Sequence, residues 1–248
     1  MAKIVISENV SLDGVIQDPT GEEGFARGGW FLEVEDDDRE QWAEVKLDEA
    51  RNAQALLLGR RTDQFFGSRW PSRTGEFADR LNGMPKYVVS ATLIDSVWGN
   101  ATILDGDVVP TISRLKGQLD GDILVYASRG LVHTLIEHEL ADELRLMIYP
   151  VLLGAGDRLF DKTSQKTPMR LLNTRAIGTS LVHLTYSIGR RPVSGHPGAE
   201  CGSGGPLRQQ SLGRLRLRSE NSADICRHTS NGSDGTRTRD LRRDRPAL

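Results

Sequence analysis

The chain has 248 residues, a formal net charge of −2 and 38% hydrophobic residues, a composition typical of a globular protein. No apolar run approaches the roughly 20 residues that a membrane-spanning helix needs, and the start MAKIVISENV is strand-like rather than a signal peptide, so we expect a cytoplasmic protein. Both cysteines, Cys201 and Cys226, lie near the C-terminal end, which excludes a cysteine nucleophile, a cysteine-ligated zinc ion and a disulfide from the preceding part of the chain.

Strand-like and helix-like segments alternate over residues 1–192, which predicts one α/β domain. Apolar spacing and turn residues predict strands at 3–8, 55–58, 86–90, 101–104, 122–127 and 143–150, and an antiparallel strand pair at 171–176 and 181–188. The same signals predict helices from 36–38 to about 54, and at 59–67, 108–119 and 130–139, with Asp36–Asp38 as N-cap candidates.

The composition changes near residue 193. Residues 193–248 hold ten arginines and six acidic residues but no lysine and no aromatic residue, so their formal charge is +4 and that of residues 1–192 is −6. This tail has no periodic apolar face, and we expect it to be disordered. Three interpretations stay open: a solvated appendage, a basic arm for nucleic acid or an anionic surface, and a frameshift or read-through product, because GTRTRDLRRDRPAL resembles a translation that runs into a transfer-RNA gene.

The sequence GRRT at 59–62 is the strongest local signal for a ligand site. It stands where a strand ends and a helix begins, so the N–H groups of the first helical turn are unpaired and favour an anion. Gly59 allows a close approach to the backbone, Arg60 and Arg61 supply donors suited to phosphate, and Thr62 adds a hydroxyl. The alternative interpretation is a capped helix with exposed arginines.

Two further loops occupy the same kind of position. YASRGL at 126–131 follows an apolar strand and precedes a helix, and its small residues would let a ligand lie against the backbone, although it lacks the GxGxxG pattern. Ser90 ends the strand KYVVS, where its hydroxyl would hold a phosphate or cap the turn. Because ligands of open α/β sheets gather at the carboxyl ends of the strands, the loops together predict one site.

The remaining candidates are weaker. Asp13 in SLDG is best interpreted as a turn residue, with a place at the mouth of a substrate site as the minority alternative. His133, His138 and His183 form no evident metal set, and we expect no metal site. The acidic charge of residues 1–192 argues against nucleic acid as a partner of this part.

Taken in order, these segments resemble the dihydrofolate reductase-like superfamily. The resemblance is closest to the branch of the C-terminal reductase domain of the bifunctional riboflavin-biosynthesis deaminase-reductase, and it spans about residues 3–190. The stretches that carry it are SLDG at 11–14, LLLGRRT at 56–62, KYVVSATL at 86–93, DILVYASRGLVHTLIEHELADELRLMIYPVLLGAG at 122–156 and RLF at 158–160.

The resemblance implies a three-layer α/β/α fold with a mainly parallel sheet of about eight strands and an antiparallel C-terminal strand pair. It also implies NADPH as the cofactor and is compatible with a homodimer. On the matching positions, Gly59, Arg60, Arg61 and Thr62 would hold the pyrophosphate and the 2′-phosphate, and Ser90 would lie near the adenosine. The stretch along the pyrophosphate and the nicotinamide would consist of Ala127, Ser128, Arg129, Gly130 and Leu131.

The sequence also departs from the family pattern. A glutamate and two glycines of the riboflavin-pathway reductases are replaced by Tyr126, Ala127 and Ser128, no carboxylate of 28–42 aligns with the acid of dihydrofolate reductases, and the deaminase half is absent. The expected function is an NADPH-dependent reduction of a pteridine- or pyrimidine-like small molecule, of the 5-amino-6-(5-phosphoribosylamino)uracil reductase type. The alternatives are a dihydrofolate reductase-type activity and a non-catalytic NADPH-binding or regulatory protein.

Overall fold

The computed structural model describes residues 1–160 and 166–189, all of which belong to one compact unit, Met1–Pro192. The tail predicted for 193–248 lies outside the described residues. None of the helices in the described ranges is long and apolar enough to span a bilayer.

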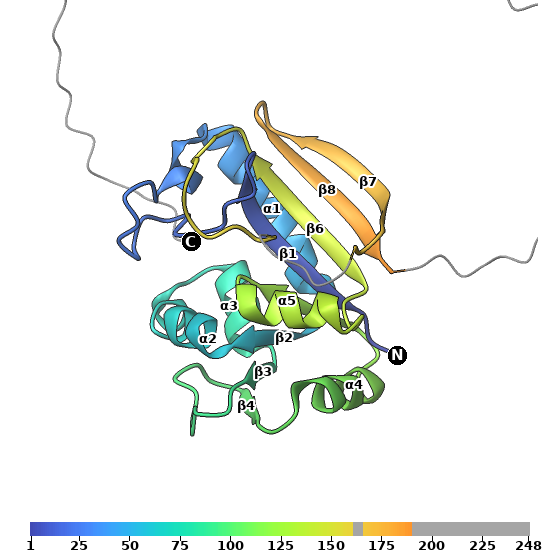
Figure 1. Cartoon of the computed structure of the whole chain (residues 1–248). Coiled ribbons are helices and arrows are strands. Elements are labelled where there is room, and N and C mark those ends of the chain that lie inside the picture. The colour runs from blue at the N-terminus through green and yellow to red at the C-terminus, as the bar shows by residue number, and fades with distance from the viewer. Residues whose placement is uncertain (161–165, 190–248) are drawn as a thin grey trace, which may run out of the picture. The chain divides into compact units, whose positions relative to one another are not determined.

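The described strands form one eight-stranded sheet with the order β4-β3-β2-β5-β1-β6-β8-β7 (Figure 1). The pairs among β1 to β6 are parallel, and β8 pairs antiparallel with both β6 and β7. The strands are β1 (Ile4–Ser11), β2 (Ala53–Gly59), β3 (Lys86–Val89), β4 (Ala101–Leu104), β5 (Asp122–Tyr126), β6 (Glu143–Tyr149), β7 (Met169–Ile177) and β8 (Leu181–Ile188).

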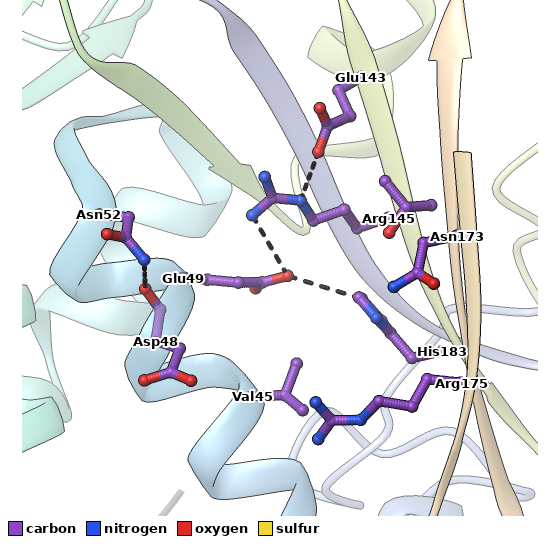
Figure 2. A pocket seen from close by; sticks show the side chains of 10 residues that line it. Val45, Asp48, Glu49, Asn52, Glu143, Arg145, Asn173, Arg175 and His183 are labelled. Carbon is purple, nitrogen blue, oxygen red and sulfur yellow. Dashed lines mark hydrogen bonds and ion pairs between the residues drawn. The ribbon is translucent and has the colours of Figure 1, made fainter. Parts of the chain in front are cut away.

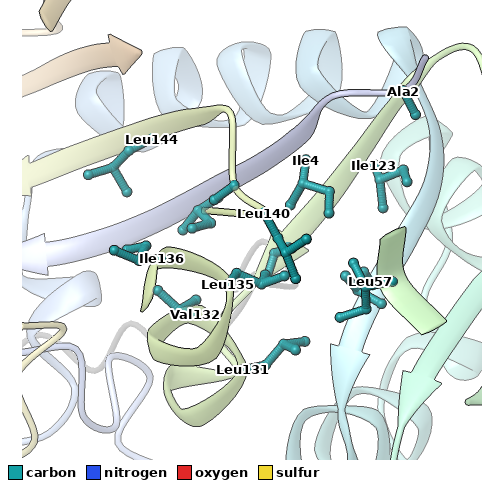
Figure 3. Packing of buried hydrophobic residues seen from close by; sticks show 14 of the residues in the cluster. Ala2, Ile4, Leu57, Ile123, Leu131, Val132, Leu135, Ile136, Leu140 and Leu144 are labelled. Carbon is teal, nitrogen blue, oxygen red and sulfur yellow. The ribbon is translucent and has the colours of Figure 1, made fainter. Parts of the chain in front are cut away.

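Helices cover both faces of the sheet, as the alternation of apolar residues along β1 requires. Ile6 faces a core that includes Val132 of the helix α5, whereas its neighbour Val5 faces a second core with Ala50 and Leu81 (Figure 3 shows the first). The helices are α1 (Asp36–Asn52), α2 (Arg60–Gly67), α3 (Glu76–Gly83), α4 (Val108–Gln118) and α5 (Arg129–Glu137), and two short 3-10 helices span Trp30–Glu33 and Trp70–Ser72. The structure thus has the expected α/β/α arrangement, with a mainly parallel sheet and an antiparallel C-terminal strand pair.

Besides shifts of one or two residues at other element ends, the structure differs from the predictions in four respects. Helix α1 ends at Asn52, so the residues at 53 and 54 belong to β2 and not to the helix. Glu35 occupies the N-cap position without a side-chain cap bond, and Asp36–Asp38 form the first turn instead. Strand β1 continues to Ser11. Helix α3 was not predicted, because an eight-residue helix shows only two turns of apolar spacing.

Candidate functional site

Three loops predicted to form a site open at one edge of the sheet. Strands β3, β2 and β5 are adjacent and parallel, so the loops that follow them leave the sheet on the same side (Figure 1). Helix α2 begins directly after β2, and two residues connect β5 to α5. The topology therefore brings Gly59–Thr62, Ser90 and the 127–131 stretch to the carboxyl edge of three neighbouring strands.

Hydrogen bonds join the end of β2 and the first turn of α2 to the loop after β5. The N–H of Gly59 donates to Ser128 Oγ at 3.0 Å, and the N–H of Ser128 donates to Thr62 Oγ1 at 3.1 Å. The hydroxyls of Thr62 and Ser128 lie 2.9 Å apart in a third hydrogen bond. We call these three hydrogen bonds the 59–62–128 latch. Sequence patterns gave no signal for it, because its partners are 66 to 69 residues apart.

The loop after β5 is strained. Ala127 has φ 50° and Ser128 has φ 58°, the left-handed region that costs a non-glycine residue about 1–2 kcal/mol. These two positions are those at which the sequence analysis found two glycines replaced. Strain of this kind persists only where neighbouring groups over-determine the conformation, and the latch supplies such contacts at Ser128.

The charged and apolar residues of the two loops have different surroundings. Arg60 and Arg61 are exposed and form no ion pair or hydrogen bond with a side chain of the described residues. The Nε of Arg129, in contrast, donates to the carbonyl oxygen of Arg158 at 2.8 Å. Leu131 packs into the core under α5, so only its backbone is available to a ligand.

Ser90 and Asp13 are engaged in local turns. Ser90 Oγ accepts the N–H groups of Thr92 and Leu93 at 3.2 and 2.9 Å, the capping contact that was the alternative to phosphate binding. The Asp13 carboxylate accepts the N–H groups of Leu153 and Gly154 at 3.1 and 2.7 Å and the Ser11 hydroxyl at 2.7 Å. The Ser11 hydroxyl, followed by these N–H groups, lowers the pKa of Asp13. These contacts fit a turn residue; a role in the chemistry stays a prediction.

Glu8 is a buried acid next to the loop after β5 that the sequence analysis missed. It is 5% exposed on β1, and its Oε1 has no hydrogen-bond partner among the described residues. Burial raises the pKa of Glu8 well above its usual value, against the opposing effects of the Lys46 charge and the Ala127 N–H. The available signal was a single charged residue within the apolar run of β1.

A second polar cluster lies between α1 and the strands β1, β6 and β8. Glu49 is 6% exposed; its Oε2 accepts the Ser7 hydroxyl at 2.8 Å and pairs with Lys46 Nζ at 3.1 Å. Its Oε1 lies 3.7 Å from Arg145 and 3.8 Å from His183 (Figure 2). Burial by itself would raise the pKa of Glu49, but the positive charges of Lys46 and Arg145 outweigh this effect, and the pKa is lowered. Burial, followed by Lys46, lowers the pKa of His183 to about 4.

This cluster forms the wall of an open pocket of about 360 Å³. Its lining combines carboxylates with cations and amides: Val45, Asp48, Glu49, Asn52, Glu143, Arg145, Asn173, Arg175, His183 and Thr185. Figure 2 shows the side chains of Glu49, Arg145 and His183 converging from α1, β6 and β8. The acids of this wall are held in ion pairs, as buried charges generally are.

Two residues relevant to the family departures are buried in structural contacts. Tyr126, at the position of the missing glutamate, is 9% exposed, and burial followed by the Glu49 charge raises its pKa well above the usual value. Asp38, in the acidic segment after the first loop, is fully buried and accepts the N–H groups of Thr179 and Ser180 at 2.6 and 3.2 Å. Both side chains are therefore buried away from solvent.

No group of histidine, cysteine, aspartate or glutamate side chains within 1–160 and 166–189 is arranged to hold a metal ion. His133, one of the three histidines considered, has its Nε2 2.6 Å from the carbonyl oxygen of Leu159.

Comparison with known protein families shows to which family the chain belongs. The family of the RibD C-terminal domain matches residues 2–183. The chain belongs to the RibD C-terminal domain family. The predicted resemblance is thereby confirmed over nearly all of the described residues. The match ends before the tail at 193–248.

One curated relative and two solved structures are similar to this chain. The chain is 26% identical over 189 residues to the uncharacterised protein YyaP of Bacillus subtilis strain 168. The aligned residues cover 74% of this chain and 94% of YyaP. A putative riboflavin biosynthesis protein of Shewanella sp. PV-4 superposes with a TM-score of 0.62 at 23% identity, over 77% of this chain and all of that one. RibD of Acinetobacter baumannii superposes with a TM-score of 0.53 at 15% identity, over 76% of this chain and 58% of that one.

Proposed function

We propose that this protein is an NADPH-dependent reductase that transfers a hydride to a pteridine- or pyrimidine-like small molecule. The RibD C-terminal family is one of NADPH-dependent pyrimidine reductases, which supports the reaction class. The observation that carries the proposal is local: Arg60 and Arg61 stand exposed, with no anionic partner among the described residues, at the start of α2, which the latch joins to the start of α5.

The residues at this edge fit a dinucleotide phosphate. Helix α5 has nine residues and begins directly after its N-cap residue, Ser128. The N–H groups of its first turn have no acceptor within the helix and therefore favour an anion. Gly130 is exposed, and a Cβ added there would meet nothing within 4 Å, so the backbone is open to approach. Arg60 and Arg61 would neutralise and orient the phosphates. NADPH supplies the hydride when it is bound.

The finer proposal is a reductase of the 5-amino-6-(5-phosphoribosylamino)uracil type. It is supported by two similar structures, those of a putative riboflavin biosynthesis protein and of a pyrimidine reductase-like protein of Corynebacterium diphtheriae. The latter superposes with a TM-score of 0.54 at 13% identity, over 77% of this chain and 93% of that one.

Titration of the purified protein with NADPH and NADH, followed by nucleotide fluorescence, tests the cofactor. We expect NADPH to bind more tightly, and we expect Arg60→Ala and Arg61→Ala to weaken NADPH about tenfold while NADH changes less, because an arginine paired with a phosphate contributes a charge-assisted hydrogen bond. Arg114→Ala, an exposed arginine on α4, is the matched control. Absence of binding to both nucleotides would refute the proposal, and equal losses for both would refute the 2′-phosphate assignment.

A non-catalytic NADPH-binding protein is the second candidate, favoured by one observation. The residue that replaces the family glutamate, Tyr126, points its hydroxyl into the buried cluster beside Glu49 rather than to an open site. NADPH oxidation with dihydrofolate and with ribosylated pyrimidines, followed at 340 nm, separates the candidates. Binding without turnover on every substrate would favour the second.

A further inference from the structure

Thr62 forms two hydrogen bonds with Ser128, a residue in the unfavourable left-handed backbone conformation. Thr62 lies in the first turn of α2 and is 7% exposed. Its Oγ1 accepts the Ser128 N–H at 3.1 Å and is hydrogen bonded to the Ser128 hydroxyl at 2.9 Å. One contact restrains the backbone of Ser128 and the other its side chain. Thr62 therefore restrains both parts of a residue whose φ of 58° is unfavourable for serine.

The latch leaves one hydrogen without an acceptor. Thr62 and Ser128 carry one hydroxyl hydrogen each, and their mutual contact uses one of the two. The third bond of the latch brings a further donor, the N–H of Gly59, to Ser128 Oγ. Within the described ranges neither hydroxyl is hydrogen bonded to any other acceptor. The pair is thus left with a surplus donor.

This surplus donor stands among other donors. Ser128 is the N-cap of α5, whose first-turn N–H groups favour an anion, and the exposed Arg60 and Arg61 follow Gly59 in the first turn of α2. A group of hydrogen-bond donors of this kind is complementary to an oxyanion.

We propose that Thr62 is a positioning residue, which holds Ser128 in the left-handed conformation so that the surplus hydroxyl hydrogen and the start of α5 face a phosphate oxygen of the ligand. The identity of the ligand as NADPH rests on the proposed function, whereas the three hydrogen bonds of the latch are independent of any ligand. The proposal differs from the expectation that Thr62 is simply a phosphate ligand: its effect on binding passes through Ser128.

A double-mutant cycle in the full chain tests this role. We expect Thr62→Val, which keeps the shape and removes the hydroxyl, to weaken NADPH binding about tenfold, and Thr62→Ser, which keeps the hydroxyl, to stay within about twofold. In the Ser128→Gly background, where glycine adopts a positive φ without strain, Thr62→Val should cost less than about threefold. The same tenfold loss in both backgrounds would show that Thr62 acts directly on the ligand and would overturn the proposal.

A measurement without ligand keeps the two proposals separable. Hydrogen exchange at the Ser128 amide should be slow in the wild type and in Thr62→Ser, and at least about tenfold faster in Thr62→Val, because the acceptor of that N–H is lost. Unchanged exchange would refute the latch. If the wild type does not bind NADPH, the proposed function fails while the exchange rates still decide the role of Thr62. Ser128→Ala provides a second variant should Thr62→Val not fold, and it should likewise weaken NADPH binding.

Discussion

At the scale of single residues, similar polar side chains differ in hydrogen bonding and in pKa because their surroundings differ. Thr62 and Ser128 have neighbouring hydroxyls, yet one is nearly covered and the other caps a helix in a strained conformation. Glu8 and Glu49 are both buried glutamates, but only Glu49 has cations within ion-pair distance. Their pKa values consequently shift in opposite directions, upward for Glu8 and downward for Glu49.

The raised pKa of Glu8 predicts a pH-dependent effect on stability. Between the usual value of 4.5 and the raised value, the folded state binds more protons than the unfolded state, so the free energy of unfolding contributed by Glu8 falls as the pH rises through this window. Glu8→Gln removes the ionisation. We expect the melting temperature of Glu8→Gln to rise relative to that of the wild type as the pH increases from about 4.5 to neutrality.

Thermal unfolding followed by circular dichroism across this pH range checks the prediction. Glu137→Gln is the control, because it makes the same substitution at an exposed position at the end of α5. A difference between Glu8→Gln and wild type that is constant with pH would contradict the role assigned to burial.

At the level of elements, loops are connected by side chains from distant helices. The 59–62–128 latch joins the starts of α2 and α5, and Asp38 in α1 joins that helix to the turn between β7 and β8. Gly178 in this turn has φ 56°, and a Cβ there would lie 2.9 Å from the Asp38 Cα, so the turn needs glycine on both grounds. Such contacts determine where the ends of elements lie.

Asp38→Ala should destabilise the protein by about 2 kcal/mol or more, because it leaves two backbone N–H groups of the β7–β8 turn without their acceptor. Urea denaturation followed by tryptophan fluorescence measures the loss. Asp37→Ala is the matched control, since Asp37 is exposed in the same helical turn and should cost clearly less. Equal losses for the two variants would show that the effect comes from the helix dipole and not from the turn.

At the scale of the whole molecule, a single sheet separates two apolar cores and brings the loops of three strands to one edge. All buried apolar residues of the described chain lie at or before Leu181. The family match ends at 183, close to this point. The expected homodimer stays a prediction.

This distribution of the core predicts the outcome of a truncation. A protein that ends at Pro192 should melt within about 2 °C of the full chain, because no buried apolar residue of the described ranges is removed. Differential scanning calorimetry of the two proteins makes the comparison. A clearly lower melting temperature for the shorter protein would show that residues 193–248 contribute to the stability of the domain.

Local patterns in the sequence were sufficient to predict most strands and helices and to indicate the family. Period-two and helical spacing predicted every described strand and every described α-helix except α3, but neither of the two 3-10 helices. The motifs at 56–62 and 122–156 indicated the RibD C-terminal family, because such patterns depend on neighbours a few residues apart. The contacts of Thr62 with Ser128, the isolation of Glu8 and the ion pairs of Glu49 were not readable in this way. They join residues far apart in sequence, and burial, which shifts their pKa values, arises only when the sheet and the helices pack.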